Sequence, residues 1–377
     1  MKCNTGTEAA VGLFSKRRKK SKLSSNPLLR WLGPSATTAG LLYAVYLFFV
    51  GGLDFSSLDQ WLPGSQSVTF EGEAITLTDE PRPNDRIRIA TFNIENFGET
   101  KAANRNDSDT GIDVMGKIAE IVNKFDIVAI QELRGKDGVA LQQLVSLLNA
   151  SGGQYAAVIS ELIGNEHRKE SYAFVWDRTR IEIIPDSSYV VQDPDGRMYR
   201  EPMVASFQSR VDPADNKAPF RFTLINVHTS PDLVDPEERD SEINVLADVF
   251  HRVREYEFRV RGEDDFILLG DLNVPPEKLG LLSEIPGVVS VAGDIKTNVS
   301  RKKTHDHILI DSNVTEEYAQ RMGVVDFIDD LGLSLEQANR ISDHLPLFAE
   351  FARYEIAPPP PPLTAQQPGQ ARTRVLQ

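Results

Sequence analysis

Short apolar runs separated by polar turns dominate the chain between residues 85 and 355. Runs of about four to eight apolar residues predict buried strands, and they occur at Ile87–Asn93, Ile127–Gln131, Ala156–Ser160, Tyr172–Trp176, Val204–Phe207, Phe220–Val227, Phe266–Leu269 and His307–Ile310. Apolar residues recur at helical spacing in three stretches, Val114–Lys124, Val139–Leu148 and Glu237–Phe258. Strands and helices alternate early and strands then cluster, which predicts an α+β fold. We expect a four-layer α/β/β/α sandwich of two packed sheets.

A longer apolar stretch lies nearer the N-terminus. Trp31–Leu53 contains 23 residues without a charged side chain, and a helix needs about 20 residues to cross the hydrocarbon core. Residues 34–53 are therefore expected to form one transmembrane helix ahead of the sandwich. The basic segment Lys16–Lys22 predicts a cytoplasmic head at residues 1–33 and an exported catalytic domain. The alternatives are a cleaved signal peptide, which secretes the domain, and a buried helix.

Polar and proline-containing segments bound the expected domain. Residues 54–84 are predicted to be a linker with one short strand, and residues 85–355 the catalytic domain. Five consecutive prolines begin at Pro358, so residues 356–377 are predicted to be a proline-rich disordered tail.

Charge and cysteine content exclude several kinds of protein. The chain has a net charge of -14, and its first 34 residues hold eight basic residues and one acid. The remainder therefore carries a charge of -21, which argues against a general nucleic-acid coat protein but not against an enzyme with a local basic groove. Cys3 is the only cysteine, so neither an internal disulfide nor a cysteine-based zinc site can form.

Polar side chains stand at the ends of the first two strands. Asn93 ends one apolar run and Glu132 directly follows another. Buried strands rarely carry such groups without a partner. Amide and carboxylate oxygens are hard ligands that suit Mg²⁺ or Mn²⁺ better than zinc. For either residue alone, the alternative is ordinary capping of a turn between strand and loop.

Later strands end in the same way. His228 follows one apolar run, and Asp271 and Asn273 follow another after a glycine. An aspartate at such a place can orient or deprotonate a water, and an asparagine can donate to a phosphate oxygen. A core histidine with satisfied hydrogen bonds and a local turn are the alternatives.

Acid and imidazole groups also occur together near the C-terminal end of the domain. Asp306 lies between His305 and His307, and the period of two in a strand turns it to the opposite face. Those two histidines have the spacing of zinc ligands, but no third nitrogen or sulfur ligand is evident. Asp343 and His344 precede the last apolar run. A carboxylate beside an imidazole raises its pKa and orients it.

Together these motifs supply what cleavage of a phosphate ester needs, namely a hard cation, a group that activates water and an acid for the leaving oxygen. Their order resembles the endonuclease/exonuclease/phosphatase superfamily over residues 86–352, and within it deoxyribonuclease I. The closer resemblance rests on Phe92–Lys101, Ile130–Arg134, Arg168–Phe174 and Tyr199–Pro202. It implies a metal-dependent endonuclease that hydrolyses DNA by attack of water on phosphate.

The resemblance also implies roles for individual residues. Glu170 would pair with His228, and Asp306 with His344, as two dyads on either side of the scissile phosphate. Asp271 would orient the attacking water or contact metal. The remaining roles are metal binding by Asn93, Glu132 and Asp343, phosphate binding by Asn273, and substrate contacts by Arg134 and Arg200. The metal would be Mg²⁺ or Mn²⁺, with Ca²⁺ as a possible structural ion. No protein partner is indicated.

Three positions depart from the nuclease pattern. Glu95 replaces a basic phosphate-contacting residue, and Asn165 and Arg168 replace an arginine and a tyrosine that reach the minor groove. Residues 102–111 resemble an inserted polar loop. These departures bear on affinity for duplex DNA. Two alternatives to a nuclease are also considered. One is a phosphodiesterase or phosphatase for lipids or small molecules, of the sphingomyelinase or inositol-phosphatase kind. The other is an inactive binding module anchored at a membrane.

Overall fold

The computed structural model describes residues 72–77, 81–103, 107, 109–135, 138–164 and 169–356. The chain divides into two compact units, Met1–Val68 and Thr69–Gln377, and every described residue belongs to the second unit. The expected cytoplasmic head, the helix at residues 34–53 and the tail from residue 357 lie outside the described residues.

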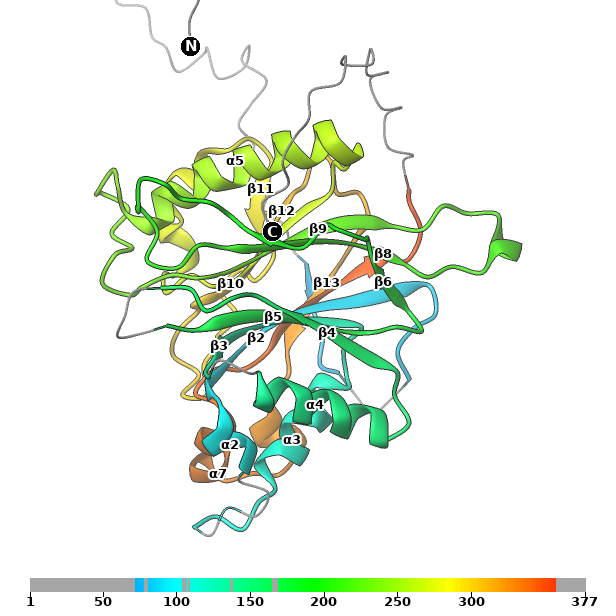
Figure 1. Cartoon of the computed structure of the whole chain (residues 1–377), viewed down its shortest axis with the longest axis vertical. Coiled ribbons are helices and arrows are strands. Elements are labelled where there is room, and N and C mark those ends of the chain that lie inside the picture. The colour runs from blue at the N-terminus through cyan, green and yellow to red at the C-terminus, as the bar shows by residue number, and fades with distance from the viewer. Residues whose placement is uncertain are drawn as a thin grey trace, which may run out of the picture. The chain divides into compact units, whose positions relative to one another are not determined.

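Two seven-stranded mixed sheets form the centre of the second unit (Figure 1). The first has the order β1-β13-β14-β2-β3-β5-β4, with bounds β1 Glu73–Ala74, β2 Arg86–Phe97, β3 Ile127–Leu133, β4 Tyr155–Ile159, β5 Ser171–Asp177, β13 Tyr318–Val324 and β14 Leu347–Ala352. The second has the order β11-β12-β10-β9-β8-β6, and β7 pairs with β8; its bounds are β6 Ile181–Ile183, β7 Tyr189–Val190, β8 Met203–Ser209, β9 Arg221–His228, β10 Phe266–Asp271, β11 Val288–Ser290 and β12 Asp306–Asp311.

Helices cover the outer face of each sheet (Figure 1). α5 lies on the second sheet, and α2, α3, α4 and α7 lie on the first. The bounds are α2 Glu99–Ala103, α3 Val114–Val122, α4 Val139–Ala150, α5 Glu242–Arg261, α6 Phe327–Asp330 and α7 Leu335–Ile341, with short 3-10 helices at Pro213–Asp215, Pro276–Lys278 and Gly280–Glu284. The expected two packed sheets with helices outside are confirmed.

The sheets pack through a core rich in aromatic side chains. Phe174 of the first sheet meets Phe207 of the second with ring centroids 5.5 Å apart, and Phe220 stacks on Phe351 at 6.0 Å. Every residue of β5 is buried, because this strand is covered by the second sheet on one face and by helices on the other. Such strands read as continuous apolar runs, which explains why the sequence pattern found them.

The expected location in a membrane is contradicted. Within the part of the chain that the structure describes, no helix is both long and apolar enough to cross a bilayer. The longest helix, α5, has 20 residues but carries charged side chains along its length. The single-pass topology with an exported catalytic domain is therefore corrected.

A buried amide network joins the two sheets where the parallel strands end. β2 runs parallel to β3 in the first sheet, and β9 runs parallel to β10 in the second. Gln131 donates through Nε2 to Asn226 Oδ1 at 2.7 Å across the sheets, and Asn226 donates in turn to the carbonyls of Ile130 and Ala173. This network fixes the two sheets relative to each other beside the polar strand ends described next.

Candidate active site

Two carboxylate–imidazole pairs stand at the ends of these strands. His228, the last residue of β9, lies with Nδ1 2.8 Å from Glu170 Oε1. His344, just before β14, lies with Nδ1 2.8 Å from Asp306 Oδ2. Each pair joins one residue of the first sheet's side to one of the second. All four side chains are buried, so each imidazole is held in one orientation by its carboxylate.

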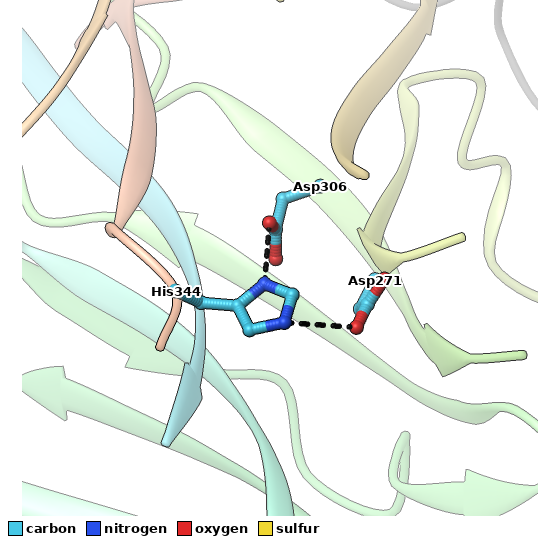
Figure 2. A group of neighbouring side chains, drawn as sticks. All are labelled: Asp271, Asp306 and His344. Carbon is cyan, nitrogen blue, oxygen red and sulfur yellow. Dashed lines mark hydrogen bonds and ion pairs between the residues drawn. The ribbon is translucent and has the colours of Figure 1, made fainter. Parts of the chain in front are cut away.

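Both imidazoles direct their second nitrogen at the same carboxylate. Asp271, the last residue of β10, places Oδ2 3.5 Å from His344 Nε2 and 3.7 Å from His228 Nε2. Figure 2 shows Asp306 at one nitrogen of the His344 ring and Asp271 at the other. The site therefore has a near-symmetric layout, with one carboxylate between two imidazoles that are each backed by a further carboxylate.

These carboxylates favour protonation of both histidines. Burial alone disfavours the charged imidazole, but Asp306 and Asp271 outweigh it and raise the pKa of His344 well above its ordinary value. Burial likewise opposes the charge on His228, and Glu170 and Asp271 overcome it and raise its pKa. The pKa of Asp271 is lowered, because the two nearby imidazoles outweigh its burial.

Arginines distinguish the two pairs. Arg200 Nη1 lies 3.4 Å from Glu170 Oε2, and Arg134 Nη2 lies 3.7 Å from the same oxygen. Arg200 also donates to the carbonyls of His228 and Thr229. These cations offset part of the charge of Glu170, and Arg200 opposes the rise in the pKa of His228. In the described ion pairs, Asp306 has only His344 as a partner.

The expected metal ligands Asn93 and Glu132 lie together beside Asp271. Asn93 Nδ2 lies 3.3 Å from Glu132 Oε1 and 3.1 Å from Asp271 Oδ2. Asn93 Oδ1 is buried without a hydrogen-bond partner. Backbone and side-chain donors and the charge of His228 outweigh burial and lower the pKa of Glu132, so it stays ionised. An orphaned amide oxygen beside two ionised carboxylates fits a hard divalent cation.

Asp343, the third expected ligand, has a different environment. Its carboxylate is 61% exposed and its Oδ1 lies 3.9 Å from His344 Nε2. Asp271, Asp306 and His344 also place ligand atoms within 4.8 Å of one another. In that second set Asp306 Oδ1 is also buried without a hydrogen-bond partner, while the contact with Asp306 occupies His344 Nδ1 and His344 Nε2 faces Asp271. Asn93 and Glu132 fit a hard cation by their oxygen ligands, and Asp343 stays the expected third ligand.

Asn273 is held beside the pairs in a strained conformation. Its Nδ2 donates to the carbonyl of Thr229 at 3.0 Å, and its backbone N–H donates to Asp271 Oδ1. Asn273 has φ of 54°, and Glu132 has φ of 63°. Non-glycine residues rarely adopt positive φ, and such strain is concentrated at functional sites.

Gly270 allows β10 to approach β9 closely. A Cβ atom at this position would lie 1.8 Å from the carbonyl oxygen of Val227, and Gly270 has φ of 147°. The following residue, Asp271, pairs in register with His228. The glycine before Asp271 is therefore required by packing that sets the distance between Asp271 and the imidazoles.

Sequence reasoning missed several residues that support the site. Lys101 of α2 donates through Nζ to the carbonyls of Glu95 and Ile341, which links α2 and the end of β2 to the end of α7. Burial lowers the pKa of Lys101 to about 8. Glu242 accepts the backbone N–H groups of Ser230 and Tyr199, both at 2.5 Å, and so holds the segments beside Arg200. The only sequence feature that pointed to Lys101 was its place at the end of the motif Phe92–Lys101. Nothing in the sequence marks Glu242.

The hydrogen bonds of His307 argue against a zinc pair with His305. His307 is fully buried, and its two ring nitrogens bind Ser290 Oγ at 2.9 Å and the carbonyl of Val274 at 2.8 Å. Burial lowers the pKa of His307 to about 4. Because both of its nitrogens are used, His307 is a structural residue of β12.

The departures from the nuclease pattern fall partly outside the described residues. Asn165 and Arg168 lie there. Glu95 lines a hollow of about 250 Å³ together with Asn96, Thr100, Lys101, Val114, Asn339 and Arg340. Arg340 ion-pairs with Asp107 and Asp109, so the 102–111 segment contacts α7 through these two residues.

Comparison with known proteins places these features in a family. The family described as "Endonuclease/Exonuclease/phosphatase family" matches residues 90–344. Deoxyribonuclease gamma from Rattus norvegicus is 30% identical over 278 residues, which cover 69% of this chain and 83% of that protein. Deoxyribonuclease-1-like 1 from Sus scrofa is 29% identical over 283 residues, 71% of this chain and 82% of that protein. Deoxyribonuclease-1 from Bos taurus is 28% identical over 281 residues, 69% and 90% of the two chains. The matched span includes both imidazole pairs.

Proposed function

The chain belongs to the endonuclease/exonuclease/phosphatase family, and on this premise we propose that it is a divalent-metal-dependent endonuclease that hydrolyses DNA. Membership makes it a hydrolase of phosphate esters. The similarity to deoxyribonucleases over 69–71% of the chain supports nucleic acid as the substrate class.

The single observation that carries the proposal is the facing pair of dyads. His228 and His344 each present Nε2 to Asp271, while Glu170 and Asp306 hold the opposite nitrogens. Hydrolysis of a diester needs one group to take a proton from water and another to give a proton to the leaving oxygen. Two oriented imidazoles on either side of one point provide both, the neutral one as base and the protonated one as acid, and the protonated imidazole also stabilises the negative charge that develops on phosphate.

The different surroundings of the dyads support a different proposed role for each. Arg200 and Arg134 contact Glu170, so His228 loses its proton more readily and acts as the general base toward water. His344, backed by Asp306 and facing Asp271, has its pKa raised further and acts as the general acid that protonates the leaving oxygen. Asp271 orients the water between them, and Asn273 binds a non-bridging phosphate oxygen.

Asn93, Glu132 and Asp343 would hold the metal, with Mg²⁺ or Mn²⁺ as the ion that suits amide and carboxylate oxygens. When bound, such an ion supplies positive charge that neutralises the phosphate. Arg134, which is partly exposed beside Glu132, is proposed to contact the substrate backbone. Arg200 is buried against Glu170, so its proposed contribution to substrate binding is indirect, through the orientation of the first dyad.

The test is a substrate panel for the purified full chain with and without divalent metal. The panel contains supercoiled plasmid, single-stranded DNA, RNA, sphingomyelin vesicles and inositol phosphates. We expect nicking of the plasmid with Mg²⁺ or Mn²⁺ and none in EDTA. Hydrolysis of sphingomyelin or inositol phosphates with intact plasmid would replace the nuclease with a lipid or small-molecule phosphoesterase. Inactivity on the entire panel with either metal would instead support a binding module.

A matched pair of variants distinguishes activity of the proposed site from activity of contaminating nucleases. His344→Ala removes a proposed acid, whereas His251→Ala changes a histidine on the exposed face of α5. We expect the first to lower the rate by about 10²–10⁴-fold and the second to leave it unchanged. Equal rates for His344→Ala and the unaltered protein would refute the proposed site.

A further inference from the structure

A second group of carboxylates lies at the other end of the strands that carry the site. Asp265 directly precedes β10, whose last residue is Asp271, so the two are separated by the length of the strand, about 20 Å. Asp265, Glu317 and Glu355 each place a carboxylate oxygen within 4.8 Å of the others. Glu263, Asp264 and Asp265 form a second such group, and Asp265 is common to both.

This acidic cluster, defined as Glu263, Asp264, Asp265, Glu317 and Glu355, is largely buried. The exposed fractions of Glu263, Asp265 and Glu317 are 2%, 4% and 2%. Buried carboxylates normally have a cation or several hydrogen-bond donors. In the part of the chain that the structure describes, the ion pairs include one to this cluster, in which Arg221 Nε lies 3.8 Å from Glu263 Oε2. One arginine at 3.8 Å does not balance five carboxylates.

Hydrogen bonds orient the carboxylates without neutralising them. Oε1 of Glu317 accepts the backbone N–H of Ile356 at 2.7 Å, and Oε1 of Glu355 accepts that of Arg221 at 2.8 Å. Oε1 of Glu263 accepts the N–H of Asp265. Asp265 Oδ1 is buried without a hydrogen-bond partner, and Glu263 Oε2 has the contact with Arg221 at 3.8 Å but no hydrogen bond. A buried, unpartnered carboxylate oxygen inside a group of carboxylates indicates a place that a cation would fill.

The cluster draws its members from both halves of the sandwich. Asp265 leads into β10 of the second sheet, whereas Glu317 leads into β13 and Glu355 follows β14, both of the first sheet. Without a cation, like charges repel one another across the boundary between the sheets. With a cation, the same residues tie the sheets together at this end.

We propose that this acidic cluster is a structural binding site for a divalent cation of the Ca²⁺ class that fastens the two sheets at the end remote from the imidazole pairs. Ca²⁺ takes six to eight oxygen ligands at about 2.3–2.6 Å, so oxygens on one ion lie up to about 5 Å apart, as they do here. Mg²⁺ gives up its waters reluctantly and demands an octahedron, which a buried cluster of carboxylates suits less well.

Thermal unfolding of the full chain, stripped of metal, tests the site. We expect Ca²⁺ to raise the unfolding midpoint by about 5–10 °C, the effect of one site filled at about 100 times its Kd in a domain of this size. Mg²⁺ at the same concentration should raise it less. Equal midpoints in Ca²⁺ and in EDTA would overturn the proposal, because the carboxylates would then share protons rather than a cation.

Two double variants locate the effect. Asp265→Asn/Glu317→Gln should abolish the Ca²⁺-dependent shift and remove one Ca²⁺ site in titration calorimetry. It should be at least as stable in EDTA as the unaltered protein, because it relieves repulsion. Glu132→Gln/Asp343→Asn changes the proposed active-site ligands and should keep the shift. If the first pair retains the shift, or the second pair loses it, the cation binds elsewhere.

The half-buried Glu355 offers a milder variant. Glu355→Gln removes one ligand without disturbing the strand that leads to Asp271, and should raise the Ca²⁺ concentration at half-maximal shift by about tenfold. An unchanged concentration would count against the site even if the double variant failed to fold.

Discussion

Arg200 lies against Glu170, with Nη1 3.4 Å from Oε2, and thereby makes the two imidazole pairs unequal. Glu170 contacts both His228 and Arg200. Among the described ion pairs, Asp306 contacts His344 alone. The His344 pair, which has no arginine, therefore stays protonated to higher pH, which suits the acid role that we propose for it. The His228 pair loses its proton at lower pH, which suits the proposed base role.

The proposed acid role of His344 predicts a dependence on the leaving group. His344→Ala should slow the cleavage of plasmid DNA by about 10²–10⁴-fold, but slow a diester with a nitrophenolate leaving group far less, because that group departs without a proton. His228→Ala should slow both substrates alike. Steady-state rates for the two substrates measure the ratio, and the reverse pattern would exchange the two roles.

Removal of Arg200 should destabilise the domain as well as the site. Arg200→Met leaves the buried Glu170 Oε2 with only the more exposed Arg134 as an arginine partner, and we expect a loss of roughly 3 kcal/mol in the free energy of unfolding. The control Arg197→Met breaks a solvent-accessible pair with Asp248 and should cost less than about 1 kcal/mol. Urea unfolding measures both. Losses of the same size would show that Arg200 is not held as a buried partner.

The close approach of β9 to Gly270 predicts that any side chain at this position destabilises the protein. Gly270→Ala should cost about 3 kcal/mol or more, because the added Cβ meets the Val227 carbonyl at 1.8 Å. Gly293→Ala, with φ of 52° and no atom near the added Cβ, should cost about 1 kcal/mol. Chemical unfolding with a nicking assay compares them, and a stable, fully active Gly270→Ala protein would contradict the close approach of the strands.

The acidic cluster predicts a pH-dependent stability in EDTA. Burial raises the pKa of Glu263 and of Glu355 to about 7, and that of Asp265 to about 9. A carboxyl with a raised folded pKa binds its proton more tightly in the folded state. Its stabilising contribution is complete below the unfolded pKa of about 4 and is lost as pH rises through the folded pKa. Stability in EDTA should therefore fall from about pH 4 to pH 9.

The active-site histidines also have raised pKa values, so they too make stability fall as pH rises. The prediction therefore concerns the difference in stability between two proteins that both contain these histidines. The stability of the unaltered protein minus that of the Asp265→Asn/Glu317→Gln variant should fall as pH rises, and Ca²⁺ should make this fall smaller. Unfolding midpoints across the pH range provide the measurement. Parallel curves for the two proteins would show that the cluster does not titrate as described.

Much of the fold was readable from local pattern. Strands such as β3, β5 and β10 are buried on both faces and are continuous apolar runs, and α3 and α4 show helical spacing. β13 and α7 were missed. β13 lies next to the two-residue edge strand β1, has an irregular burial pattern and includes Arg321. α7 is only seven residues long, so neither element leaves a clear periodic signal.

The sequence by itself determined which polar groups end the buried strands, because a carboxylate or imidazole after an apolar run is a local feature. Tertiary structure alone decided what those groups face. Asp271 meets both imidazoles because β9 and β10 lie in parallel register, and Arg200 turns inward to Glu170. Glu263, Glu317 and Glu355 are unremarkable acids in the sequence, and only the packing of two sheets gathers them, since contacts between distant segments depend on how the layers meet.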